Sequence, residues 1–299
     1  KIIAMGFDKD ELDGLRTKVT LNPEPLDESE EDESSMAAVI AVMMGGIMGF
    51  LMYITIFVYG MMVMRSVMEE KTNRIVEVMI SSVRPFQLMM GKILGVGAVA
   101  LTQIAIWAVL IPSLSMVVQL IFGVSSTSNL ETAANNMPVD QEEVSFAISQ
   151  VLGELAAQNW WLIIPVFILF FLGGYLLYSS MFAAIGSAMG DEMGEGQILT
   201  IPIFIPVIIA FYIMTVAIRA PHSSLAVWSS IFPFFSPIVM PARLAFDPPL
   251  WQIALSVISL LATSLFFVWL SGRIYRVGIL MYGKKVSFKE LGKWMFYKS

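Results

Sequence analysis

The sequence lacks the side chains from which most metal and redox sites are built. Its 299 residues include no cysteine and one histidine, His222. Zinc, iron–sulfur and haem sites rely on these two residue types, so we expect no metal or cofactor in this chain. Disulfide bonds are excluded as well. The 22 methionines are interpreted as flexible packing residues between helices rather than as a metal-binding cluster.

Charged residues are also scarce. They make up 14% of the chain, against 57% hydrophobic residues, whereas soluble domains usually contain about 25% charged residues. Five stretches contain no Asp, Glu, Lys or Arg, and each can supply the ~20 apolar residues of a membrane-spanning helix. These stretches are 34–64, 93–122, 155–190, 196–218 and 248–272. The composition predicts an all-α polytopic membrane protein and excludes collagen, a disordered chain and a nucleic-acid-binding protein.

The chain divides into a short polar segment and a membrane domain. Residues 1–36 are interpreted as the end of an extracytoplasmic domain and an acidic tether, because 24–33 contain seven acids and no base. The membrane domain covers 37–299. Because five spans leave the two chain ends on opposite sides, we expect a sixth span before Lys1 in the native protein. The five predicted spans lie at about 37–64, 93–113, 160–182, 197–218 and 250–271.

Lysine and arginine residues indicate how these spans are oriented. Five lie between the first two spans and seven follow the last one, whereas 219–247 contains two and 123–159 contains none. Basic loops remain in the cytoplasm. We therefore expect the tail at 272–299 to be cytoplasmic and residues 1–36 to be extracytoplasmic. The residues on the basic side are Arg65, Lys71, Arg74, Arg84, Lys92, Arg273, Arg276, Lys284, Lys285, Lys289, Lys293 and Lys298.

The segment 223–247 is apolar enough to be confused with a further span. It carries Pro233, Pro237 and Pro241. Each proline removes a helical hydrogen bond, which lipid-exposed backbone tolerates poorly. A span here would also move the basic tail to the outside. The segment is therefore predicted to be a re-entrant or interfacial element at the outer leaflet.

The connection between the first two spans predicts an amphipathic helix over 68–83. Apolar residues fall on one face and polar residues on the other. The apolar face consists of Met68, Ile75, Val76, Met79 and Val83, and the polar face of Glu70, Asn73, Arg74, Glu77 and Ser81. Two interpretations stay open at this point, because such a helix can merely join two spans or can transmit force between them.

Three motifs make a family resemblance specific. They are MEEKTNRIVEVMISSVRPFQLMMGKILG at 68–95, FFSPIVMPARL at 234–244 and GRIYRVGILMYGKKVSFKELGKW at 272–294. Together they resemble the membrane subunit of ABC type-2 exporters, within the subgroup that contains bacterial sodium-efflux permeases. The resemblance covers about 36–299, in order and at similar spacing.

The resemblance implies an architecture and a set of partners. Six spans are the rule in that family, so the five spans here correspond to the second to sixth. The helix at 68–83 then becomes a coupling helix that docks on a separate cytoplasmic ATPase, where ATP and Mg²⁺ bind. A second permease copy and membrane lipid are further implied partners, and the implied location is the bacterial plasma (inner) membrane. The residues expected to contact the ATPase are Glu69, Glu70, Lys71, Arg74 and Glu77.

The chain itself contains no nucleotide-binding motif. The phosphate-binding pattern GxxxxGK[ST] is absent, because neither Lys92 nor Lys284 is followed by Ser or Thr. Energy for transport would have to come from a partner. The chain is therefore interpreted as a transporter subunit rather than an enzyme.

The predicted spans lack charged side chains in their middle. None has Asp, Glu, Lys, Arg or His in its middle, which disfavours the alternative of an ATPase-independent channel or secondary carrier. An intramembrane protease is disfavoured further, because it needs ligands or a base at that depth. Thr102, Gln103 and Gln197 either line a pathway or form hydrogen bonds between helices, and the second interpretation is favoured. Gly45 and Gly49 predict close helix packing. The candidate substrates are sodium and drug-like or lipid-like compounds.

Overall fold

A computed structural model describes residues 28–75, 78, 82–122, 153, 155–189, 197–281 and 288–295. Within these residues every regular element is a helix and no strand occurs. The chain divides into two compact units, Lys1–Met36 and Ala37–Ser299, and nearly all described residues belong to the second unit. The prediction of an all-α membrane domain is confirmed.

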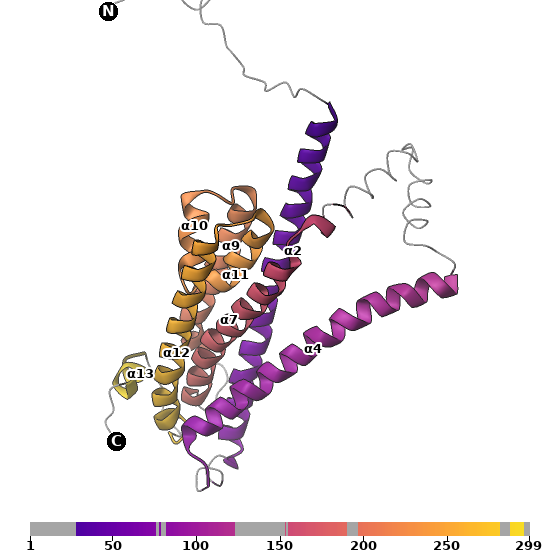
Figure 1. Cartoon of the computed structure of the whole chain (residues 1–299). Helices are drawn as coiled ribbons and strands as arrows, with labels where there is room; N and C mark the ends of the chain where they lie inside the picture. The colour runs from indigo at the N-terminus through magenta and orange to yellow at the C-terminus, as the bar shows by residue number, and fades with distance from the viewer. Residues whose placement is uncertain are drawn as a thin grey trace, which may run out of the picture. The chain divides into compact units, whose positions relative to one another are not determined.

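Five long helices form the second unit (Figure 1). They are α2 (Glu28–Thr72), α4 (Pro85–Phe122), α7 (Trp160–Ala188), α9 (Ile201–Arg219) and α12 (Leu250–Gly278). Each contains a segment long and apolar enough to cross a membrane, as predicted. Several helices extend past the predicted spans: α2 continues beyond residue 64 to Thr72, and α12 continues beyond 271 to Gly278. Hydropathy marks the part of a helix that suits lipid, whereas the backbone hydrogen bonds continue through the charged residues that follow.

Successive long helices run in opposite directions, and each has one end at a shared level (Figure 1). We call this level the junction end: α2, α7 and α12 end there, and α4 and α9 begin there. Helices α7 and α12 pack along each other, and Gly173 permits their contact because a Cβ there would lie 2.8 Å from Leu260 Cδ2. The short helices η2 (Gln197–Thr200) and α13 (Phe288–Met295) adjoin α9 and α12 respectively.

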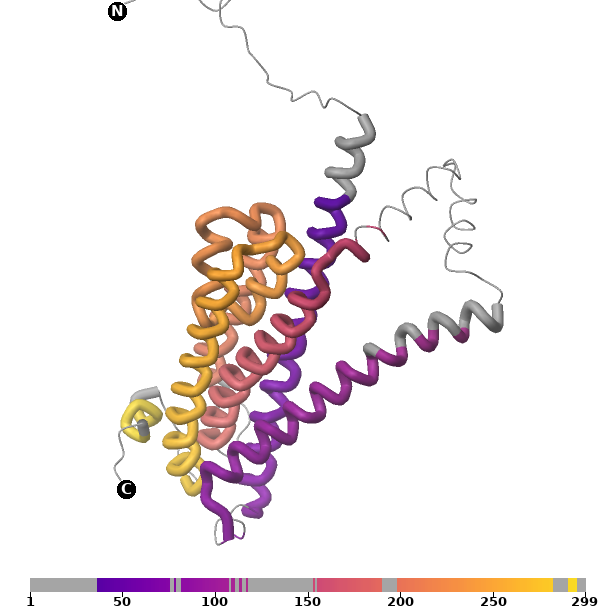
Figure 2. The backbone as a smooth tube through the Cα atoms, in the orientation of Figure 1, coloured from indigo at the N-terminus to yellow at the C-terminus, as the bar shows by residue number. Residues whose placement is uncertain are grey.

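A helical hairpin occupies the opposite level, which we call the hairpin end (Figure 2). It consists of α10 (Ser224–Ile231), α11 (Ser236–Arg243) and the short helix η3 (Leu244–Phe246). Ser223 caps α10 by accepting a hydrogen bond from the Ala226 N–H at 3.3 Å. Helices of this length reach about 12 Å at 1.5 Å per residue, too short to cross a bilayer. Their packing against α9, α7 and α12 agrees with the predicted re-entrant element.

Small residues on α2 let the hairpin pack closely. A Cβ at Gly49 would lie 2.9 Å from the Ala242 Cβ of α11, and a Cβ at Gly45 would clash with the Ala242 carbonyl oxygen. On α7, a Cβ at Gly174 would lie 2.5 Å from Pro237 Cβ. Glycine at these three positions therefore lets the hairpin pack closely against α2 and α7. The predicted close packing at Gly45 and Gly49 is confirmed as a contact within the chain.

Candidate functional site

The first feature of the junction end is a break in the predicted coupling helix. Residues 68–72 form the last turn and a half of α2, which ends at Thr72. Asn73 and Arg74 form a turn, and Arg74 has a φ of 55°, in the left-handed region. The predicted helix over 68–83 is therefore divided at this turn. The amphipathic spacing runs through the break without a glycine or proline to mark it, so the sequence pattern could not locate it.

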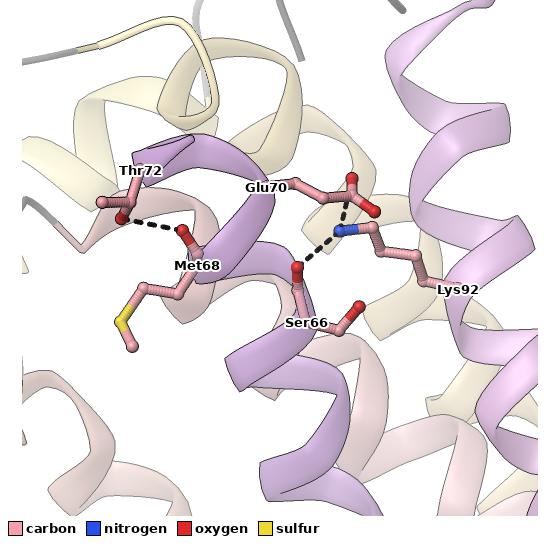
Figure 3. A network of polar contacts seen from close by, with 5 residues as sticks. All are labelled: Ser66, Met68, Glu70, Thr72 and Lys92. Carbon is pink, nitrogen blue, oxygen red and sulfur yellow. Dashed lines mark hydrogen bonds and ion pairs between the residues drawn. The ribbon is translucent and has the colours of Figure 1, made fainter. Parts of the chain in front are cut away.

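The second feature is an ion pair that joins α2 to α4. Figure 3 shows Lys92 of α4 extending toward α2, where its Nζ lies 2.7 Å from Glu70 Oε2. The same Nζ donates a hydrogen bond of 2.9 Å to the Ser66 carbonyl. The Lys92 side chain is 8% exposed and that of Glu70 27%. Because the pair is largely shielded from water, salt screens it less than it screens a surface ion pair.

The third feature is a buried lysine that joins three helix ends. Lys71 is 3% exposed, and its Nζ donates hydrogen bonds of 2.6 Å to the Ser187 carbonyl and 2.8 Å to the Gly278 carbonyl. These carbonyls belong to the last turns of α7 and α12. The C-terminal end of a helix carries a partial negative charge, which favours a cation there. We call Lys71 and these two carbonyls the three-helix clasp.

Glycine makes the clasp sterically feasible. A Cβ at Gly278 would lie 2.7 Å from Ser187 Oγ and 3.0 Å from the Ser187 carbonyl oxygen. A Cβ at Gly186 would lie 2.7 Å from the Met64 carbonyl oxygen of α2. Contacts this short do not occur for real side chains, so α2, α7 and α12 meet here through their backbones.

The predicted ATPase-contacting residues therefore separate into three groups. Glu69 and Arg74 are exposed at the junction end. Glu70 and Lys71 instead make contacts within the membrane domain, to α4 and to the three-helix clasp. Glu77 lies outside the described residues. Lys92 was missed as a partner, because it lies beyond the connection in the next helix and no local pattern joins it to Glu70.

The residues predicted to line a pathway or join helices lie as follows. Gln103 Oε1 accepts a hydrogen bond of 2.6 Å from the Tyr59 hydroxyl, which joins α4 to α2. Thr102 donates to the Ala98 carbonyl of its own helix at 2.7 Å. Gln197 begins η2, and its side chain lies outside the described set. The favoured interpretation, hydrogen bonding between helices, therefore holds for Gln103 and not for Thr102.

A buried arginine holds the hairpin end together. Arg243 is 1% exposed. Its Nε donates to the Pro221 carbonyl at 2.9 Å, and its two terminal nitrogens donate to Ser230 Oγ at 2.5 Å and to Gln252 Oε1 at 3.0 Å. Burial lowers the pKa of this guanidinium from its ordinary value, which is high enough for the group to remain charged. The sequence identified Arg243 only as one of two basic residues in the outer connection.

Comparison with known proteins gives a consistent result. The sequence profile of a family described as ABC-2 family transporter protein matches residues 13–273. An uncharacterised protein of Bacillus subtilis, YhaP, is 28% identical over 288 residues, which are 96% of this chain and 62% of that protein. An uncharacterised protein of Methanocaldococcus jannaschii, MJ1024, is 28% identical over 250 residues, or 83% of this chain and 53% of that protein. The chain thus spans between half and two thirds of these relatives' length. No solved structure matches it.

Proposed function

The chain belongs to the ABC-2 transporter family, whose members are membrane components of ABC exporters, and we propose that a separate cytoplasmic ATPase drives it. ATP and Mg²⁺ bind to that ATPase, and a second permease copy completes the transporter. Sodium is the first candidate substrate, on the subgroup resemblance alone. Drug-like and lipid-like compounds are the others. The alternative of an ATPase-independent channel or secondary carrier is disfavoured by spans without central ionisable residues.

The connectivity of the junction end is the observation that carries this proposal. The connection at 73–84 begins at the end of α2 and leads directly into α4. Lys92 ties α4 back to α2, and Lys71 ties α2 to the ends of α7 and α12. A force applied to the connection therefore reaches four helix ends at once. Such packed elements move as units between discrete arrangements, as coupling to an ATPase requires.

The basic residues support a cytoplasmic location for this end of the bundle. Arg65, Lys71, Arg74, Arg84 and Lys92 all lie at the junction end or in its connection. Basic segments beside spans are retained on the cytoplasmic side. On this basis the hairpin end faces outward and the C-terminal tail lies inside. An ATPase in the cytoplasm can then reach Glu69 and Arg74, the two exposed members of the predicted contact set.

Charge reversal at the exposed contact residues tests this proposal. Glu69→Lys and Arg74→Glu are each expected to reduce the amount of ATPase that co-purifies with the tagged chain by about tenfold, because they place like charges against the partner. Both side chains are exposed, so expression should be unchanged. The matched control is Arg219→Glu, which reverses an exposed arginine at the hairpin end. Full retention of the ATPase by both junction variants would argue against this contact.

A further inference from the structure

A cavity opens at the junction end between α2 and the start of α9. Its volume is about 590 Å³, within the roughly 300–1,000 Å³ range of small-molecule binding sites. Residues of α2 form one wall, and η2 with the first turn of α9 forms the other. The lining residues are Met61, Met64, Arg65, Met68, Met189, Ile198, Thr200, Ile201 and Phe204.

The α2 wall is one face of a helix. Met61, Met64, Arg65 and Met68 are separated by three, four and seven positions, which places them along a single stripe. Three of these four residues are methionines, and Met189 adds a fourth thioether to the lining. Methionine side chains are flexible and polarisable, so they adapt to ligands of varied shape. This wall suits a hydrocarbon chain rather than one rigid ligand.

The opposite wall is exposed at its edge. Ile198 is 60% exposed and Ile201 is 48% exposed, although both line the cavity. Arg65 follows directly on the uncharged run 34–64, at the level where hydrocarbon gives way to headgroups. The cavity is therefore open along its apolar edge, and Arg65 supplies the one cation of its lining.

Arg65 distinguishes this cavity from an ordinary packing gap. It makes no ion pair or hydrogen bond with another described residue, whereas the guanidinium of Arg243 has three acceptors. At the junction end, Lys71 and Lys92 also have acceptors, which are carbonyl oxygens for Lys71 and a carboxylate oxygen for Lys92. A guanidinium binds carboxylate and phosphate groups through paired hydrogen bonds. The positive charge of Arg65 thus complements an anionic headgroup.

We propose that this cavity binds an anionic amphiphile, with the hydrocarbon chain along the methionine wall and the acidic headgroup on Arg65. The ligand enters from the leaflet at the junction end. The two sources of this chemistry are an acidic membrane phospholipid and a free amphiphile such as a fatty acid. The proposal concerns binding alone and does not depend on an ATPase.

Photolabelling tests the proposal directly. The full chain is placed in phosphatidylcholine nanodiscs with a diazirine-bearing hexadecanoate, and the labelled peptides are mapped after illumination. Label is expected within 61–68 and 198–204. Arg65→Gln should reduce it by about tenfold, the effect of losing one charge-assisted contact. Ile201→Trp should reduce it too, by filling the cavity mouth from a half-exposed position.

The controls separate this cavity from general adsorption to the bundle. Arg84→Gln removes an exposed arginine of the connection at 73–84 that does not line the cavity, and it should retain full labelling. A diazirine-bearing hexadecanol should label weakly, with no difference between the wild type and Arg65→Gln. Equal labelling by both probes, or hexadecanoate labelling unchanged in both Arg65→Gln and Ile201→Trp, would overturn the proposal.

Competition identifies the source of the ligand. Displacement of the probe by phosphatidylglycerol in the disc assigns the site to an acidic membrane lipid. Displacement by soluble oleate, but not by phosphatidylglycerol, assigns it to a free amphiphile. Displacement by neither would contradict the assignment of the site to anionic amphiphiles. Because no ATPase is present, the result is independent of whether an ATPase drives this chain.

Discussion

Replacing Lys71 by methionine is expected to destabilise the membrane domain and, on the proposed function, to abolish stimulation of the partner ATPase. Methionine is similar in length to lysine but lacks the ammonium group that forms the three-helix clasp. The carbonyls of Ser187 and Gly278 then lose the donor that satisfies them at 2.6 and 2.8 Å. A buried acceptor left without a partner costs about 1–3 kcal/mol. Loss of the clasp also removes the contact through which α2 would move α7 and α12.

The measurement is thermal unfolding in detergent together with ATPase stimulation by the reconstituted chain. Lys293→Met is the matched control, because it makes the same substitution at an exposed lysine of α13. Exposed substitutions of this kind usually change the free energy of unfolding by less than about 0.5 kcal/mol. A Lys71→Met variant with unchanged unfolding and full ATPase stimulation would show that the clasp is dispensable.

Replacing Arg243 by methionine is expected to have the largest effect on folding. Its guanidinium joins the turn after α9 to α10 and α12 through Pro221, Ser230 and Gln252. Hydrogen bonds to a charged group contribute about 1.5–3 kcal/mol each. Three are lost together, and two of the acceptors, on Ser230 and Gln252, are buried in the folded chain. The hairpin should detach from α9 and α12, so we expect little folded protein in the membrane.

Two further variants make this result interpretable. Arg243→Lys retains the charge but presents one nitrogen in place of the planar fork, so it can satisfy fewer of the three acceptors. Its folded yield should fall between those of the wild type and Arg243→Met. Arg219→Met changes an exposed arginine at the same end and should fold normally. The measurement is monodisperse yield by size-exclusion chromatography. Wild-type yield from Arg243→Met would refute the structural role.

Some parts of the fold follow directly from local sequence. Uncharged runs predicted the five spans because lipid contact demands apolar side chains over a fixed length. Pro233, Pro237 and Pro241 predicted a re-entrant or interfacial element because each removes a backbone donor. Helix ends were less predictable. The helix α2 continues to Thr72 because its backbone hydrogen bonds do not depend on whether a side chain is charged.

The contacts at the junction end could not be predicted in the same way. Lys71 bonds to carbonyls that lie 116 and 207 positions away in the chain, and no local pattern encodes such a pairing. Glu70 appeared as part of a polar helix face because periodicity shows which side of a helix is polar and not what lies opposite. The methionines of α2 were assigned to packing. Only the position of η2 and α9 shows that Met61, Met64 and Met68 border a cavity.

Cross-linking tests the central claim most directly, that a cytoplasmic ATPase contacts the connection between α2 and α4. The chain contains no cysteine, so a single introduced cysteine carries a photoreactive benzophenone without background. Cysteines are placed at Asn73 and Val83, which are exposed in that connection, and at Asp247, which is exposed at the hairpin end. After co-expression with the ABC ATPase and illumination, the ATPase should cross-link from Asn73 and Val83 but not from Asp247. Absence of a cross-link from both connection sites, or equal yield from Asp247, would contradict the account.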